Sequence, residues 1–316
     1  MVKNQPTVIS TFSGCGGSSL GYKWAGYKEL LAIDFDQNSV ETFRLNFPDV
    51  PCWQRDIREV SGKEILKFCK IEKRELDLLD GSPPCQGFSI SGKREVNDER
   101  NNLFLEFVRL IKELEPKVFL MENVPGMIKG KMKGRFIEIM KTLKKLPYKV
   151  KCKKMNTAYY SVPQNRERLI WIGVRNDLNK EPSYPLPDKK IITVREALDG
   201  LLEDTSATLT GRVLELWLQS KPGKDFSNYH EKGSWFNHRK INPDKPCPVI
   251  TTSLTLYHWE YPRRLNISEL KRLASFPDNF QFIGSFGQQW ARIGNAVMPK
   301  FMEAIALHIR KNILEM

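Results

Sequence analysis

The chain lacks the features that would direct it to a membrane or to an oxidising compartment. Its 316 residues contain no apolar run near the roughly 20 residues that a membrane span requires. A strand-like segment begins at residue 7, which leaves no room for a signal peptide. The six cysteines are scattered, with no Cys-x-x-Cys pair and no neighbouring histidine, so neither a metal site nor a disulfide framework is expected. These absences predict a cytoplasmic protein with reduced cysteines.

The sequence is also poor in acidic residues. It has 37 Asp and Glu against 50 Lys and Arg, which gives a formal net charge of +13 and a pI of about 9.4. This excess favours a polyanionic partner, and nucleic acid over a membrane because no basic amphipathic helix stands out. Residues 129–154 are the most basic stretch, with Glu138 as the one acid. Within it, the glycine-punctuated residues 129–135 are the better candidates for phosphate contacts, since residues 136–146 have helical spacing.

Short apolar runs alternate with helical patterns between residues 7 and 175. Strands are expected at residues 7–12, 30–33, 76–79, 118–121 and 169–174. An amphipathic helix is expected at residues 103–114, where apolar side chains recur on one face. The alternation predicts an α/β fold with a doubly wound, mainly parallel sheet. Ligands of such sheets bind at the carboxyl ends of the strands.

Beyond residue 176 prolines interrupt this pattern. Residues 185–262 are expected to form a small, loop-rich second domain. Residues 1–184, completed by residues 263–316, would form the large domain. Helices are expected again at residues 267–276 and from about Pro299.

A glycine-rich turn, Gly14-Cys15-Gly16-Gly17, follows the first expected strand. It fails the G-x-G-x-x-G pattern of dinucleotide-binding proteins because Ser19 occupies the third glycine position. S-adenosylmethionine carries no phosphate and tolerates a looser turn. Asp34 follows the second strand and is placed to accept both ribose hydroxyls of such a ligand. It can equally cap the next helix, a role that Asp36 or Asn38 can also fill.

Three further groups of reactive side chains stand at strand ends. Cys85 follows the third strand behind Pro83-Pro84, a brace that suits a nucleophile, although a free cysteine can also be a small packing residue. Glu122 follows the fourth strand and suits proton transfer or helix capping. Arg166 and Arg168 precede the fifth strand, where surface charge is the common alternative.

Four motifs together resemble those of the DNA (cytosine-5)-methyltransferases. They are Pro-Pro-Cys-Gln at 83–86, Glu-Asn-Val at 122–124, Gln-x-Arg-x-Arg at 164–168 and Gly-Asn-x-Val at 294–297, in the family's order. The resemblance covers nearly the whole chain except residues 185–245. It implies a Rossmann-like methyltransferase sheet, S-adenosylmethionine as cofactor and double-stranded DNA as substrate. It further implies a prokaryotic enzyme that is monomeric and paired with a restriction endonuclease.

The resemblance also assigns roles to individual residues. The thiolate of Cys85 would add to C6 of a flipped cytosine, Glu122 would protonate N3, and Arg168 would contact O2 and Glu122, with Arg166 in the same catalytic group. The implied cofactor contacts are Phe12, Gly14, Gly16, Gly17, Asp34, Phe35, Asp56, Ile57, Pro83, Leu103, Asn295 and Val297.

DNA contacts are expected in a lid loop and in the second domain. Ser89 and Ser91 belong to the loop that would close over DNA, and Thr251 lies in a short Thr motif that would support the flipped nucleotide. Residues 185–262 would recognise the target, with Arg239, Lys240 and Arg263 as candidates for reading guanine edges.

Three other functions remain open at this point. The tRNA-acting branch of the same family shares the chemistry, and a catalytically silent DNA-binding relative would share the fold. A nicotinamide dehydrogenase is disfavoured by Ser19 and by the lack of an obvious hydride-transfer histidine.

Overall fold

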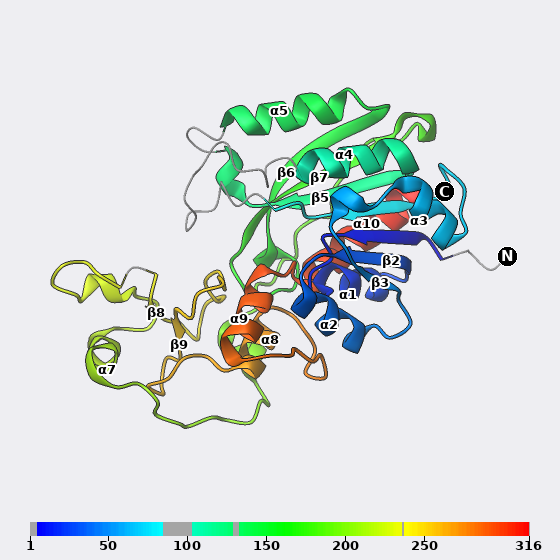
Figure 1. Ribbon diagram of the computed structural model, residues 1–316. Coiled ribbons are helices and arrows are strands. Elements are labelled where there is room, and N and C mark those ends of the chain that lie inside the picture. Colours follow the sequence, from blue (N-terminus) through cyan, green and yellow to red (C-terminus); the bar gives the residue numbers. More distant parts are fainter. Residues whose placement is uncertain (1–4, 85–102, 129–132, 236, 316) are drawn as a thin grey trace. The chain divides into compact units, whose positions relative to one another are not determined.

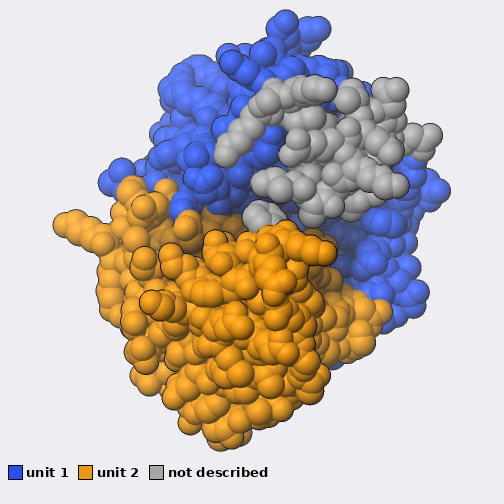
Figure 2. Space-filling model, turned by 90° about the vertical axis from the view of Figure 1, so that its left-hand side faces the viewer, with its two compact units in different colours: residues 1–156, 167–186, 301–316 blue, residues 157–166, 187–300 orange. Residues whose placement is uncertain are grey.

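The computed structural model describes residues 5–84, 103–128, 133–235 and 237–315. Three predicted site residues, Cys85, Ser89 and Ser91, lie outside these ranges. The chain divides into two compact units, coloured separately in Figure 2. Unit 1 comprises Met1–Asn156, Glu167–Leu186 and Phe301–Met316, and unit 2 comprises Thr157–Arg166 and Pro187–Lys300.

Unit 1 contains a seven-stranded sheet. Its strands are β1 (Thr7–Thr11), β2 (Lys28–Asp34), β3 (Cys52–Gln54), β4 (Leu78–Gly81), β5 (Val118–Asn123), β6 (Tyr148–Asn156) and β7 (Glu167–Arg175). They lie in the order β3-β2-β1-β4-β5-β7-β6. The first five in this order are parallel, whereas β7 runs antiparallel to both β5 and β6. The predicted doubly wound, mainly parallel sheet is confirmed.

Helices cover both faces of this sheet (Figure 1). One face carries α1 (Gly17–Trp24), α2 (Gln37–Asn46) and α10 (Pro299–Ile309). The other carries α3 (Gly62–Cys69), α4 (Leu103–Leu114) and α5 (Lys133–Lys144). A π-helical turn, Arg310–Leu314, follows α10.

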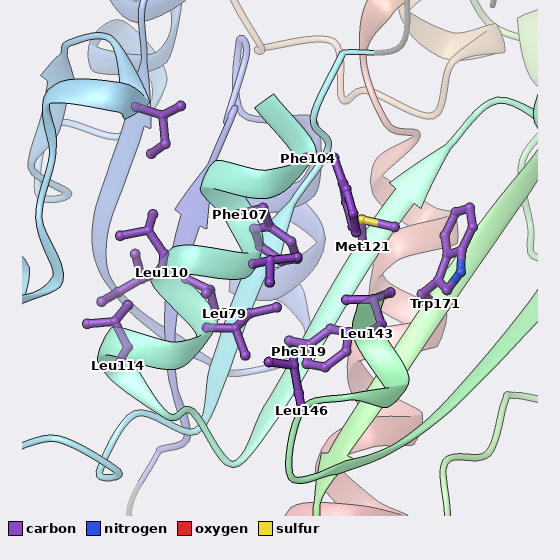
Figure 3. Close-up of a cluster of buried hydrophobic side chains, with 14 of the residues drawn as sticks. Leu79, Phe104, Phe107, Leu110, Leu114, Phe119, Met121, Leu143, Leu146 and Trp171 are labelled. Carbon is purple, nitrogen blue, oxygen red and sulfur yellow. The ribbon is translucent and has the colours of Figure 1, made fainter. Parts of the chain in front are cut away.

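The core under α4 fixes the end of β4. Phe107 of α4 packs edge-on against Phe119 of β5, with 6.3 Å between the ring centroids, beside Leu79 of β4 (Figure 3). A Cβ added to Gly81 would lie 2.5 Å from the Phe107 ring, so only glycine fits there. The segment that leads to Cys85 therefore leaves the sheet from a position set by tight packing.

The basic stretch of the sequence contributes an edge strand. Lys149 and Lys151 of β6 contact Glu181 at 2.8 and 3.1 Å, and Lys154 contacts Glu167 at 2.8 Å. Charged side chains on an edge strand oppose pairing with other chains. These lysines therefore have a structural role, while residues 129–132 lie outside the described ranges.

Unit 2 consists of short elements around a small core. Its helices are α6 (Val194–Leu198), α7 (Gly211–Gln219), α8 (Ile267–Leu273) and α9 (Phe286–Asn295), and its strands are β8 (Arg239–Lys240) and β9 (Leu256–Tyr257). Trp217 and Phe226 pack with Tyr257, and the Trp217 indole donates to the His258 carbonyl at 2.9 Å. This compact unit extends to Lys300, whereas the limits 185–262 for target recognition stay a prediction about function.

Candidate active site

Several of the predicted site residues, Asp34 and Glu122 among them, lie at the carboxyl edge of the sheet in unit 1. The strand order reverses between β1 and β4, which are parallel neighbours pairing Thr11 with Gly81. Such a reversal opens a crevice outside the strand ends, where doubly wound proteins bind their ligands. Asp34 ends β2 and Glu122 lies near the end of β5, so both stand at this edge.

Asp34 joins the glycine turn to the end of β2. Its Oδ2 accepts a hydrogen bond from the Gly14 N–H at 2.7 Å, and its Oδ1 accepts one from the Asp36 N–H at 2.9 Å. Burial raises the pKa of Asp34 from its ordinary value of 3.8. The cap of α2 is Asp36, whose carboxylate accepts from the Ser39 N–H at 2.8 Å. The alternative role of Asp34 as the helix cap is thereby removed.

Two glycines of the turn differ in what surrounds them. Gly16 has φ of 93°, and a Cβ there would lie 2.4 Å from the Phe47 ring. Gly14 has φ of 55°, yet a Cβ there would meet no atom of the described residues within 4 Å. Gly16 is therefore needed for folding, whereas the space beside Gly14 is open to a ligand.

Aromatic and acidic side chains follow β2 and β3 at the same edge. Phe35, directly after Asp34, is 72% exposed, which leaves its ring free to stack. Asp56 caps a short turn at Ile57–Glu59 and pairs with Arg58 at 2.6 Å. The Arg58 guanidinium holds the pKa of Asp56 below its ordinary value. Ile57 is buried in the core beneath this turn.

Glu122 and Arg168 form a buried ion pair. Glu122 of β5 lies opposite Ile170 of β7 in the antiparallel register, which brings Arg168 alongside it. The Arg168 Nε is 2.5 Å from the Glu122 Oε1, and the two side chains are only 12% and 11% exposed. Burial lowers the pKa of Arg168, an effect that Glu122 opposes. The structure thus brings this predicted pair together and leaves the second Glu122 oxygen outside that contact.

Asn123 ties the same strand to the segment before Cys85. Its side-chain N–H donates to the Pro83 carbonyl at 3.0 Å, and its Oδ1 accepts from the Val124 N–H at 2.8 Å. From the sequence, Asn123 was assigned no role of its own beyond its place in the Glu-Asn-Val motif. Because Pro83 is two residues before Cys85, this bond fixes the path of the chain toward the predicted nucleophile.

Comparison with known proteins agrees with this geometry. A family model described as C-5 cytosine-specific DNA methylase matches residues 6–311. The chain belongs to this family. It is 36% identical to the Type II methyltransferase M1.HphI of Haemophilus parahaemolyticus, with 96% of this chain and 87% of the relative covered. It is 31% identical to M.DdeI of Desulfomicrobium norvegicum, with 96% and 88% covered.

A solved structure shares the same fold. A prophage-encoded E. coli protein, described as a DNA modification methyltransferase, has a TM-score of 0.84 and 27% identity to this chain. The match covers 98% of this chain and 100% of that one. The chain is accordingly a DNA (cytosine-5)-methyltransferase with a Rossmann-like methyltransferase fold.

Arg166 of the methyltransferase is buried and makes its hydrogen bonds within unit 2. Its guanidinium donates to the Ile250 carbonyl at 2.9 Å and to the Gly294 carbonyl at 2.8 Å. Gln164 supports the same segment by accepting from the Ile250 N–H at 3.2 Å. Arg166 therefore positions backbone, and its predicted place among the catalytic groups has no support in these contacts.

Thr251, Asn295 and Val297, the other predicted site residues in these motifs, differ in exposure. Thr251 is exposed, while its carbonyl accepts from the Trp290 indole at 3.0 Å. Asn295, the last residue of α9, is exposed, and Val297 is half-buried. Their predicted roles toward the flipped nucleotide and the cofactor stay predictions.

Two of the three basic residues expected to read DNA are internal in the methyltransferase. Arg263 is 3% exposed and makes a double hydrogen bond to the Glu269 carboxylate at 2.8 and 2.7 Å. The Lys240 ammonium lies 3.6 Å from the Trp217 ring centroid, and burial lowers its pKa. Both side chains are held by partners within the unit, which argues against base contacts. Arg239 keeps a side chain that is 37% exposed.

Sequence reasoning missed two acidic residues near α1, the half-buried Glu29 and the buried Asp80. The Glu29 carboxylate accepts from the hydroxyls of Ser10 at 2.5 Å and Ser19 at 2.9 Å. Ser19, which breaks the dinucleotide pattern, thus has a structural partner. Asp80 of β4 is 2% exposed, and its Oδ1 has no hydrogen-bond partner among the described residues. Burial raises the pKa of Glu29 to about 7 and that of Asp80 to about 8.

The described part of the methyltransferase has neither a candidate metal site nor a candidate membrane span. Within it, no group of three or more His, Cys, Asp or Glu side chains could hold a metal ion. None of its helices is both long and apolar enough to cross a bilayer.

Proposed function

We propose that this methyltransferase modifies C5 of a cytosine within a short sequence of duplex DNA, through a covalent bond between Cys85 and C6. The observation that carries the proposal is the arrangement of Glu122, Arg168 and Asn123 at the carboxyl edge. Glu122 is held by Arg168, and Asn123 binds the Pro83 carbonyl just before Cys85. A nucleophile that follows β4 in the sequence and an acid on the neighbouring β5 suit addition to a pyrimidine ring.

The addition step requires a thiolate and a proton donor. As the Cys85 sulfur bonds to C6, the electrons of the ring shift toward N3, which takes a proton from Glu122. The carboxylate that results is stabilised by the Arg168 guanidinium, which already contacts its Oε1. C5 is then an enamine carbon able to form a bond to a methyl group. N3 returns its proton to the Glu122 carboxylate as C5 takes the methyl group. A water molecule then accepts the C5 proton, the electrons of that C–H bond form the C5=C6 double bond, and the C6–S bond breaks to release the Cys85 thiolate.

The residues that follow β1, β2 and β3 at the carboxyl edge fit S-adenosylmethionine. This compound, when bound, supplies the methyl group. The open space beside Gly14 admits a ligand without phosphates, and the Asp34 carboxylate, already oriented by two backbone N–H groups, would accept the ribose hydroxyls. The exposed Phe35 ring and Asp56 would contact the adenine. The remaining predicted contacts are Phe12, Gly16, Gly17, Ile57, Pro83, Leu103, Asn295 and Val297.

The substrate proposal rests on relatives and on charge. The similar curated proteins are named Type II methyltransferases, and the family model describes DNA methylases. A net charge of +13 suits the DNA backbone. These findings favour DNA over tRNA. The cytosine would leave the duplex to reach Cys85, with Ser89, Ser91 and Thr251 near the gap and Arg239 as the remaining candidate for reading bases. The proposed enzyme is a cytoplasmic monomer that is paired with a restriction endonuclease.

The test is a covalent trap with DNA that contains 5-fluorocytosine at the methylated position. Fluorine cannot leave C5 as a cation, so the Cys85–C6 bond should persist and shift the protein in a denaturing gel. Cys85→Ser should give no adduct, whereas the control Cys69→Ser, at another free cysteine, should react like the wild type. Glu122→Gln should slow adduct formation by about 100-fold or more, since it removes the proton for N3. An adduct in Cys85→Ser would overturn the proposed nucleophile.

A further inference from the structure

A groove on unit 1 is lined by basic side chains that cytosine methylation does not use. Its volume is about 810 Å³, within the range of small-molecule sites. Five lysines contribute to its walls: Lys63, Lys67, Lys70, Lys73 and Lys112.

Three of these lysines form a stripe that begins on α3. Lys63 and Lys67 stand four residues apart on one side of the helix. Lys70 follows as the C-cap of α3, with left-handed backbone angles of φ 54° and ψ 46°. Leu66 lies on the same side and lines the groove with Ile71, so part of its surface is apolar. Lys112 of α4 also lines the groove.

Most of these positive charges have no carboxylate partner. Lys73 is paired with Glu115 at 2.9 Å. Glu113, one of two glutamates in the lining, is already bound by Arg109 at 3.1 Å. Across the ranges that the structure describes, Lys63, Lys67, Lys70 and Lys112 make no ion pair. Four like charges around one concavity repel one another, and a bound anion would relieve that repulsion.

We propose that this groove binds a small polyphosphate anion, a molecule with three or more linked phosphates such as a nucleoside triphosphate. Lysine ammonium groups suit phosphates as point charges, and the Leu66 and Ile71 side chains offer an apolar surface to a base. The stripe runs along α3 away from the carboxyl edge and ends at Lys70, before the amino end of β4 at Leu78. A duplex engaged at the carboxyl edge would therefore not follow it.

Calorimetric titration of the full chain with sodium tripolyphosphate and with ATP, both free of Mg²⁺, tests the proposal. One molecule of either probe should bind per chain. The variant Lys67→Ala/Lys70→Ala/Lys112→Ala should lose about thirtyfold in affinity, and Lys67→Gln alone about threefold. The matched control is Lys141→Ala/Lys144→Ala/Lys145→Ala, which removes three exposed lysines around α5 and should bind as the wild type does.

Several outcomes would overturn the proposal. Equal losses in the groove and control variants would mean that only general surface charge attracts the probes. Unchanged binding in the groove variants would place the phosphates elsewhere. If the groove variants keep tripolyphosphate binding but lose affinity for a duplex, the surface belongs to DNA instead. Should the triple variant not fold, Lys67→Gln decides the result, because one exposed side chain is changed on an intact helix.

Discussion

Replacing Asp80 by asparagine should make the stability of the protein less sensitive to pH. Asp80 is 2% exposed, and its Oδ1 lacks a hydrogen-bond partner among the described residues. Burial raises its pKa from 3.8 to about 8, and the nearby Glu29 and Glu122 carboxylates act in the same direction. The folded protein therefore holds a proton on Asp80 that the unfolded chain releases at neutral pH.

The size of the effect follows from this difference in pKa. An acid whose pKa is higher in the folded state contributes stability that is fully present below about pH 4 and is lost as the pH rises toward 8. Each pH unit in this window corresponds to about 1.4 kcal/mol. Between pH 5.5 and 7.5 the wild type should therefore lose about 3 kcal/mol that Asp80→Asn does not lose.

Urea unfolding followed by far-UV circular dichroism at several pH values measures this difference. The free energy of unfolding of Asp80→Asn, relative to the wild type, should rise with pH across the window. Asp49→Asn, at an exposed position, is the control and should show no such trend. A difference between Asp80→Asn and the wild type that stays constant from pH 5.5 to 7.5 would refute the reasoning.

Three other substitutions separate folding from ligand binding. Gly16→Ala should destabilise the protein by about 2 kcal/mol or more, seen as a lower Tm, because its backbone has positive φ and its Cβ would strike Phe47; an unchanged Tm would contradict this. Gly14→Ala should instead weaken S-adenosylmethionine binding about tenfold or more, since its Cβ enters the open space, whereas Gly200→Ala, with similar φ and no close atom, should leave calorimetric affinity unchanged. Equal affinities in both would place the cofactor elsewhere. Arg166→Ala should cost about 3 kcal/mol in unfolding free energy by leaving two carbonyls unpaired, with catalysis retained in the folded fraction; full stability without activity would make it catalytic.

Much of the fold could be predicted because buried parallel strands are short apolar runs. β5 is buried at every position, and α4 begins and ends where its apolar face does. Two strands of the seven-stranded sheet, β3 and β6, were not expected because they lack this pattern. β3 has only three residues, and β6 is a lysine-rich edge strand whose apolar side chains are diluted by exposed charges.

Site residues could be predicted where a short sequence motif identifies them. They could not be predicted where their role depends on a side chain that is distant in the sequence. Glu122 and Arg168 were paired through their motifs, and the structure has the contact. The sequence does not show that Arg263 meets Glu269 or that Lys240 lies over Trp217, so both were assigned to DNA. Burial alone distinguishes a basic residue that holds the fold from one that is free to bind.

The buried Asp80 was missed for a related reason. Asp80 directly follows an apolar run and was not singled out, because an acid at a strand end is usually solvated. Asp80 is buried because α1 packs over the sheet, and the residues next to Asp80 in the sequence do not predict that packing.

Bisulfite sequencing of DNA from cells that express the protein is the most direct test of cytosine-5 methylation. Cytosine at one position of one short sequence should resist conversion throughout the genome. Cys85→Ser should abolish this protection, whereas Cys69→Ser should preserve it. If DNA from cells with folded, cofactor-binding wild-type protein shows no protected sequence, the assignment to DNA methylation is contradicted.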